Sequence, residues 1–171
     1  LRLKRCIDSV DEKVEVVISL NKPSIRIKEQ VNFMLRQKKE KKKYQDIKFV
    51  VCEIKKPSIA GAYNNGIKHA AYDHIFLMDS DCIFEKKCIR KLENNLGNRL
   101  LSKCKVIFTA NSWVTKIVAK AREFHTSDKV SAYSPPLLFS KKIISYIGGY
   151  YFHPKLCWLE DSEFDKRVRN A

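Results

Sequence analysis

Residues 74–84 read HIFLMDSDCIF, an apolar run that is interrupted by Asp79 and Asp81 and then resumes. Burying an unpaired carboxylate is costly, so these acids either face water or have a positive partner that the sequence does not contain. In the first interpretation they form a solvated Asx turn where a strand over 74–78 ends. In the second, both carboxylates reach one hard cation, because alternate residues of an extended chain point the same way.

The chain around this stretch alternates between two patterns. Continuous apolar, β-branched runs predict buried strands, and apolar residues at helical spacing predict helices. The predicted strands are 14–19, 47–53, 74–78, 104–110 and a less regular one near 131–139. The predicted helices are one from Ser24 to the basic block, 58–71, 85–96, 113–123, 140–147 and one from about Leu159. This order predicts an α/β fold of βαβ units, with a mainly parallel central sheet flanked by helices in one domain of 171 residues.

The predicted sheet places the two acids at a binding edge. Ligands of parallel α/β sheets bind at the carboxyl ends of the strands, where 19–21, 52–53 and 79–81 would meet. Oxygen ligands suit magnesium or manganese. Such a cation would join the acids to a nucleotide diphosphate that they would otherwise repel.

A second acidic stretch, WLEDSEFDKRV, covers 158–168. Glu160 and Asp161 begin the last predicted helix, where negative charge stabilises the positive end of the helix. The same position allows chemistry, because an aspartate carboxylate is ionised at neutral pH and accepts a proton from an attacking hydroxyl. Trp158 either stacks on the face of an acceptor sugar or packs in the core beside the helix.

The composition of the chain favours anionic binding partners but does not distinguish between them. Thirty-four Lys and Arg against 19 Asp and Glu give a net charge of +15, which attracts nucleic acid, anionic lipid or phosphorylated substrates. Most simply, the basic block 36–43 is a solvated helix end. Six cysteines without a CxxC pair indicate buried thiols, and no apolar run approaches 18 residues. We therefore expect a reducing, cytoplasmic setting without a membrane span. The missing initiator Met and the abrupt end suggest a segment of a longer chain.

Several segments together resemble family 2 glycosyltransferases of the GT-A fold, over about residues 14–169. They are VEVVISLN (14–21), LRQ (35–37), FVVCE (49–53), GAYNNGIKHA (61–70), MDSD (78–81), IGGYY (147–151) and LEDSEFDKRV (159–168). The resemblance implies a nucleotide-binding part over about 14–110 and an acceptor and base part over about 111–171. It also implies a role in building polysaccharides of the cell envelope.

The resemblance assigns residues to the donor site. Ser19 and Asn21 would border the nucleotide base, Glu53 would contact uracil, and Asn64 would belong to the same donor site. Asp79 and Asp81 match the metal-binding DxD motif that holds Mn²⁺ or Mg²⁺ and the donor diphosphate.

Asp161 matches the catalytic base, with Glu160 before it and Trp158 beside the acceptor. The implied reaction is inverting transfer of a sugar, from a UDP-sugar in the favoured case, to a hydroxyl of a glycan or lipid-linked acceptor. The basic surface would then serve an anionic acceptor or a peripheral contact with the anionic inner membrane face.

Departures from the family pattern leave alternatives open. Leu20 stands where a tyrosine is usual, Cys52 and Glu53 replace paired aspartates, and Tyr63 replaces an arginine, which allows a module that binds without catalysing. VCE at 51–53 and other stretches also resemble β-1,4-galactosyltransferases and chondroitin polymerases, which share the GT-A fold. A basic nucleic-acid-binding domain would explain the +15 charge. It would not explain acids at the ligand rim, which repel phosphates, so no nucleic acid is expected as a partner.

Overall fold

The computed structural model describes residues 2–122, 135–156 and 158–171. Its α-helices are α1 (Arg2–Ser9), α2 (Ile25–Lys39), α3 (Ile59–His69), α4 (Cys88–Leu96), α5 (Trp113–Arg122) and α6 (Glu160–Asn170). Its strands are β1 (Glu15–Asn21), β2 (Lys48–Ile54), β3 (His74–Leu77), β4 (Leu101–Lys103) and β5 (Leu137–Ser140). Two short 3₁₀-helices, η1 (Lys42–Tyr44) and η3 (Lys141–Ser145), complete the described elements. The α/β class predicted from the alternation is confirmed.

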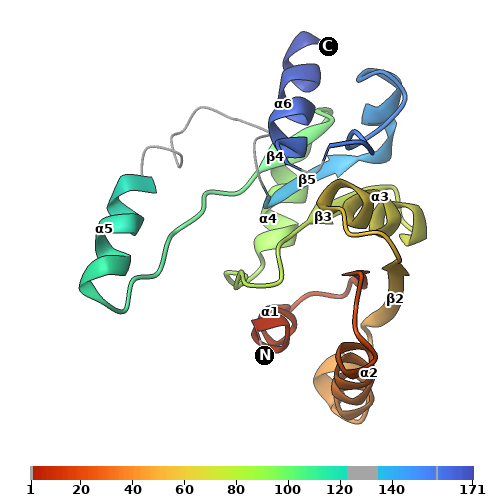
Figure 1. Ribbon diagram of the computed structural model, residues 1–171, viewed down its shortest axis with the longest axis vertical. Coiled ribbons are helices and arrows are strands. Elements are labelled where there is room, and N and C mark those ends of the chain that lie inside the picture. Colours follow the sequence, from red (N-terminus) through yellow and green to blue (C-terminus); the bar gives the residue numbers. More distant parts are fainter. Residues whose placement is uncertain (1, 123–134, 157) are drawn as a thin grey trace.

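The described strands form two sheets of different pairing. β1 and β2 are parallel, in register from Glu15 opposite Lys48 to Asn21 opposite Ile54. β3 and β4 both pair antiparallel with β5, which lies between them. The parallel pairing expected from the βαβ order is therefore found in the first sheet, whereas the second is antiparallel. Figure 1 shows α3 next to β2, with the β3–β5–β4 sheet and α6 beyond it.

Within the described residues, three apolar clusters hold these layers together, and the smallest joins α4 to β5 through Leu92, Leu96 and Leu138. Of the two larger clusters, one joins α1, β1 and α2 through Ile7, Ile18 and Leu35. The other joins β5 to α6, where Phe139 and Phe164 are fully buried with ring centroids 6.1 Å apart. Because Phe164 lies in the second turn of α6, its burial also fixes the position of the first turn of that helix.

The predicted strand over 104–110 is wrong, because the ladder ends at Lys103. β4 pairs with β5, whose first residue is Leu137, and the residues before it are Pro135 and Pro136. The Cys104 N–H still donates to the Pro136 carbonyl at 3.4 Å. Proline has no backbone N–H to donate in return, so the regular ladder ends at Lys103. The described part of the predicted strand near 131–139 is β5, and residues 131–134 lie outside the described residues.

Other predicted boundaries shift by a few residues. The helix predicted over 85–96 begins at Cys88, after Lys87 in the left-handed region with φ of 56°. The helix predicted over 140–147 is instead the five-residue 3₁₀-helix η3. Ser58 begins α3 as predicted, its hydroxyl accepting the Gly61 N–H at 2.9 Å. The sequence pattern did not predict α1.

The thiol prediction is confirmed in part. Cys6 and Cys52 are buried, whereas Cys82, Cys88 and Cys104 are half-buried, and all five are free. The sulfurs of Cys88 and Cys104 lie 3.3 Å apart. Cys157 lies outside the described residues.

Candidate active site

A cavity of about 1120 Å³ lies along β1 and β3 and collects most of the predicted site residues. Ser19 and Asn21 line it from β1, Asp79 from the turn after β3, and Glu160 and Asp161 from the start of α6. Ser19 and Asp161 lie more than 140 positions apart in the chain, so only the fold brings these segments together. The lining does not include Glu53, Asn64, Asp81 or Trp158.

Asp79 is a half-buried acid with a specific partner. The Tyr63 hydroxyl of α3 donates a hydrogen bond of 2.9 Å to its Oδ1 atom. Burial raises the pKa of Asp79, and the charges of Asp81 and Asp161 raise it further, against the hydrogen bond from Tyr63. A simple solvated turn would leave this carboxylate in water, so the first interpretation of the sequence motif does not describe Asp79.

Asp81, unlike Asp79, is largely exposed to solvent. Its side chain is 54% exposed and lies 3.6 Å from the Arg2 guanidinium of α1. The backbone turns sharply here, with the Cys82 N–H donating to the Asp79 carbonyl at 3.3 Å. The Cys6 thiol of α1 reaches the same carbonyl oxygen at 3.8 Å. The unpredicted helix α1 therefore supports the turn that carries both aspartates.

The first turn of α6 supplies two further acids. Leu159, which precedes the helix, has a left-handed backbone with φ of 63°, and the helix begins at Glu160. Glu160 is buried, and burial raises its pKa, with the charges of Asp161 and Asp79 adding to the shift. The Asp161 Oδ1 atom accepts the Ser162 N–H at 2.8 Å. The charges of Asp79, Asp81, Glu160 and Asp161 thus act on one another within one site.

Lys103 of β4 lies near this acidic group. Burial lowers the pKa of Lys103, and the charges of Asp165 and Asp161 oppose that shift. The sequence analysis did not single out Lys103, because a lysine just before a predicted strand carries no local signal. Tyr63 was noted only as a departure from a family pattern, and its contact with Asp79 depends on how α3 packs.

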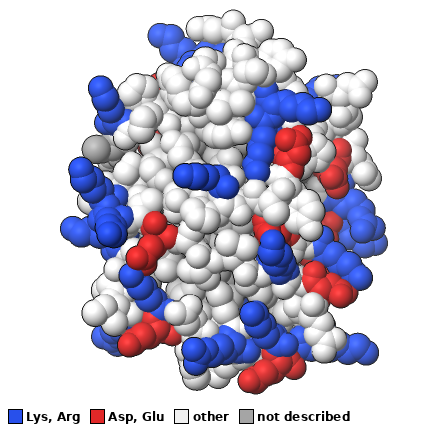
Figure 2. Space-filling model, turned by 90° about the vertical axis from the view of Figure 1, so that its right-hand side faces the viewer, with Lys and Arg blue, Asp and Glu red and all other residues white. Residues whose placement is uncertain are grey.

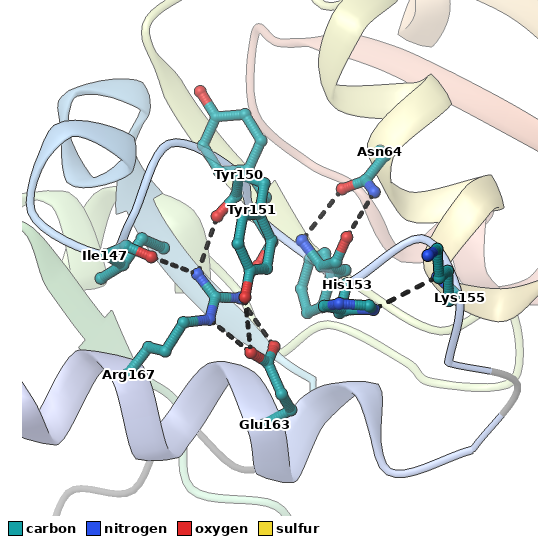
Figure 3. A network of polar contacts seen from close by, with 9 residues as sticks. Asn64, Ile147, Tyr150, Tyr151, His153, Lys155, Glu163 and Arg167 are labelled. Atoms are coloured by element: carbon teal, nitrogen blue, oxygen red, sulfur yellow. Dashed lines mark hydrogen bonds and ion pairs between the residues drawn. The ribbon is translucent and has the colours of Figure 1, made fainter.

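The segment before α6 is held by Arg167 (Figure 3). This side chain donates to the carbonyl oxygens of Ile147, Tyr150 and Tyr151 and to both carboxylate oxygens of Glu163. The guanidinium carbon also lies 3.9 Å from the centroid of the Tyr150 ring. Arg167 lowers the pKa of Glu163, chiefly through this hydrogen-bonded ion pair.

Asn64 holds the same segment from the other side (Figure 3). Its Nδ2 donates to the Phe152 carbonyl at 2.7 Å, and its Oδ1 accepts the Phe152 N–H at 3.0 Å. Both polar ends of the amide are thus taken by backbone. The predicted donor role of Asn64 stays a prediction, and the contacts describe a side chain that positions the segment leading to α6.

The nucleotide end of the predicted site lies along β1 and β2. The Ser19 hydroxyl is buried and has no hydrogen-bond partner among the described residues. Asn21 accepts the Ser58 N–H through its Oδ1 atom at 3.0 Å, which ties β1 to the start of α3. Glu53 is partly exposed outside the cavity lining, with its carboxylate 2.5 Å from the Lys28 ammonium.

Trp158 is 78% exposed. The alternative that it packs in the core is therefore wrong, because the core beside α6 is filled by Phe139, Phe152 and Phe164. Its predicted contact with an acceptor remains a prediction. Trp158 is not among the residues that line the cavity.

The DxD carboxylates fit a divalent cation in their chemistry. Asp79 and Asp81 present oxygen donors only, and each raises the electrostatic cost of ionising its neighbours. Within residues 2–122, 135–156 and 158–171, no group of three or more His, Cys, Asp or Glu side chains is placed to hold a metal. The phosphates of a donor would supply further oxygen ligands to a cation at this turn.

Comparison with known proteins agrees with this arrangement. The sequence profile described as Glycosyl transferase family 2 matches residues 1–142, which include both DxD aspartates and end before α6. Crystal structures of S. aureus TarS match 98% of this chain at 13% and 14% identity, with TM-scores of 0.63 and 0.67. The chain spans 51% of one of these structures, which covers TarS residues 1–349, and 31% of the other. A search of curated proteins finds no significant match. The structural similarity shows the shared fold, which is the expected GT-A fold.

Proposed function

Because the chain belongs to glycosyltransferase family 2, we propose that it transfers a sugar from a nucleoside diphosphate donor to an acceptor hydroxyl. The donor is a UDP-sugar in the favoured case, and the acceptor is a glycan or a lipid-linked saccharide. The observation that carries this proposal is the meeting of Asp79 with Glu160 and Asp161 in one cavity, although they come from different parts of the chain.

The donor's nucleoside would lie along the carboxyl ends of β1 and β2. The buried Ser19 hydroxyl supports this placement, because an unpartnered buried hydroxyl gains stability from a ligand that offers a hydrogen bond. Asn21 lines the cavity beside it. Glu53 would contact the base from the edge of β2, which requires its carboxylate to exchange Lys28 for the ligand.

The diphosphate would lie at the DxD turn. Asp79 and Asp81 would hold Mn²⁺ or Mg²⁺, which when bound neutralises the charge of the departing diphosphate. Tyr63 fixes the Asp79 side chain through its hydrogen bond and leaves Oδ2 for another partner. Holding a ligand side chain in one orientation is a recurring requirement of such sites.

Asp161 would act as the general base. Its carboxylate takes the proton of the acceptor hydroxyl as that oxygen bonds to the anomeric carbon. The bond from that carbon to the diphosphate oxygen breaks, and the electron pair leaves with the nucleoside diphosphate. Attack from the face opposite the leaving group inverts the anomeric configuration. Glu160, buried beside Asp161, and the exposed Trp158 would shape the acceptor side.

Donor binding is tested by the shift in melting temperature with UDP, GDP and CDP, each with and without manganese. A ligand at 100 times its Kd stabilises the folded state by about 2.7 kcal/mol. We expect a manganese-dependent shift with UDP that Asp81→Asn abolishes and that Glu29→Gln, at an exposed acid of α2, leaves intact. No shift with any nucleotide would contradict the proposed donor site.

Catalysis is tested separately by replacing the base. Asp161→Asn should lower transfer from UDP-sugars by about 10²–10⁴-fold, the usual contribution of a general base. UDP binding should be unchanged. Asp165→Asn, one turn later on α6, serves as the matched control. Transfer by Asp161→Asn at the parent rate would refute the assignment, and UDP binding without transfer by the parent would favour a module that only binds.

A further inference from the structure

Helix α5 stands apart from the rest of the described fold (Figure 1). It follows the extended segment after β4, and its first turn is fixed locally. The Ser112 hydroxyl accepts the Thr115 N–H at 3.2 Å, while the Thr115 hydroxyl accepts the Ser112 N–H at 2.8 Å. This reciprocal cap needs no contact with the body of the protein.

The side chains of α5 expose an unusual amount of apolar surface. Trp113 is 76% exposed, and Val114, Ile117 and Val118 are also exposed. At 3.6 residues per turn these four side chains fall within an arc of about 140°. Ile107, in the segment that leads to the helix, is 81% exposed. A contiguous apolar face of this kind marks an interaction site.

Among the described residues of α5 and its leading segment, the charges beside this face are positive. Lys116 and Lys120 both lie on the side of Trp113 that faces away from Val118, about 60° and 20° from Trp113 on the helical wheel, and both are exposed. Lys105 is exposed in the preceding segment, and residues 104–121 contain no Asp or Glu. On the side of the molecule shown in Figure 2, by contrast, basic and acidic side chains are interleaved. Within residues 104–121, the positive charge beside the apolar face of α5 is therefore not balanced by any acid.

We propose that α5 and its leading segment bind an anionic lipid surface, with the apolar face in the acyl boundary and the lysines at the headgroups. Short helices with a Trp-bearing apolar face and lysines on the polar face bind membranes in this way. None of the helices within the described ranges is long and apolar enough to span a bilayer.

Other partners fit these side chains less well. Polyanionic glycans and nucleic acids would engage the lysines but would leave Trp113, Ile117 and Val118 in water. A second copy of the helix would bring lysines together, and one ten-residue helix face is far smaller than a stable dimer interface. Lipid alone satisfies both the apolar arc and the charge. The inference does not depend on donor binding or catalysis.

The two tryptophans allow a site-specific test with the full chain. Trp158→Phe leaves Trp113 as the sole indole, and Trp113→Phe leaves the equally exposed Trp158 as its control. With vesicles of phosphatidylcholine and phosphatidylglycerol, Trp113 emission should shift to the blue and Trp158 emission should not. Vesicles of phosphatidylcholine alone should give a much smaller shift at the same lipid concentration.

Paired variants separate the apolar face from bulk charge in a vesicle sedimentation assay. Ile117→Ser with Val118→Ser should abolish binding without changing the melting temperature. Lys116→Gln with Lys120→Gln should weaken partitioning by about fivefold for each lysine. Lys55→Gln with Lys56→Gln removes two exposed charges elsewhere and should have a clearly smaller effect.

Three results would overturn the proposal. One is Trp113 emission that ignores anionic vesicles, and another is equal loss of binding in both lysine pairs, which would indicate general charge attraction. The third is a blue shift that follows protein concentration without lipid, which would indicate self-association. A failed UDP titration would leave these outcomes unaffected, so the two proposals fail independently.

Discussion

Glu160 and Glu163 lie three residues apart on α6 and have opposite electrostatic environments. Glu163 is paired with Arg167, which lowers its pKa. Glu160 is buried beside Asp161 and under the influence of Asp79, and its pKa is raised. The same side chain therefore contributes to stability at one position and opposes it at the other.

This difference separates the scaffold of the site from its chemistry. Arg167 donates to the carbonyl oxygens of Ile147, Tyr150 and Tyr151 and to the Glu163 carboxylate at once, so it holds the segment over 147–151 in place. Among the described residues, the acids of the cavity are compensated only in part, by the Tyr63 hydroxyl at Asp79 and the charge of Lys103 near Asp161, while Arg2 pairs with Asp81 outside the cavity lining. Incompletely compensated charge in a cavity is typical of a ligand-binding or catalytic site.

Removing the scaffold should have the largest effect. Arg167→Met leaves Glu163 without its cation and three backbone carbonyls without their donor, so we expect a loss of about 3 kcal/mol. For a domain of this size that corresponds to a fall in Tm of roughly 6–12 °C. Urea and thermal unfolding would measure it.

Arg169→Met is the matched control on the same helix. Arg169 also pairs with an acid four residues before it, Asp165, but its side chain is 56% exposed compared with 17% for Arg167. Exposed pairs of this kind contribute about 0.3–0.5 kcal/mol. Similar losses in the two variants would show that the Arg167 network is no more than a surface ion pair.

Removing the Asn64 side chain should cost less stability than removing Arg167. Asn64→Ala removes two hydrogen bonds to Phe152 and leaves its partly buried N–H and carbonyl unpaired, at a cost of about 1–3 kcal/mol. Comparison of UDP affinity in this variant and in Arg167→Met distinguishes the two roles of Asn64. Equal affinity at a temperature where both are folded supports positioning, and a loss confined to Asn64→Ala supports the predicted donor contact.

Replacing Glu160 should change the stability least, and it should raise the stability where the other substitutions lower it. A raised pKa means that the stabilising contribution of Glu160 is full below its unfolded value of 4.5 and fades as the pH rises through its folded value. Glu160→Gln should therefore stabilise the protein by about 0.5–1 kcal/mol at neutral pH and have no effect near pH 3.

Glu163→Gln provides the contrast. Its lowered pKa gives stability that is present above 4.5 and lost as the pH falls through the folded value. This substitution should destabilise the protein at neutral pH and have less effect under acidic conditions. Parallel pH profiles for Glu160→Gln and Glu163→Gln would contradict the comparison on which these predictions rest.

Local patterns predicted well where local forces dominate. The runs that became β1, β2 and β3 were found because apolar, β-branched runs favour strands, although the predicted burial of the second run is wrong, since only Cys52 of β2 is buried. Ser58 was found because a helix start needs a side-chain acceptor. The strand over 104–110 failed because its pairing depends on Pro135 and Pro136 in another segment. Helix α1 was missed because it has few apolar residues, and these are buried only by packing against β1 and α2.

By itself, the sequence determined the α/β class, the position of the DxD acids after a buried strand and the acidic start of α6, since periodicity and helix ends are local properties. Only the tertiary structure decided that Asp79 and Glu160 share a cavity, that Tyr63 holds Asp79, and that Trp158 stays outside the core. The physical reason is that burial and charge coupling depend on distances in space, and those are set by packing between segments far apart in the chain.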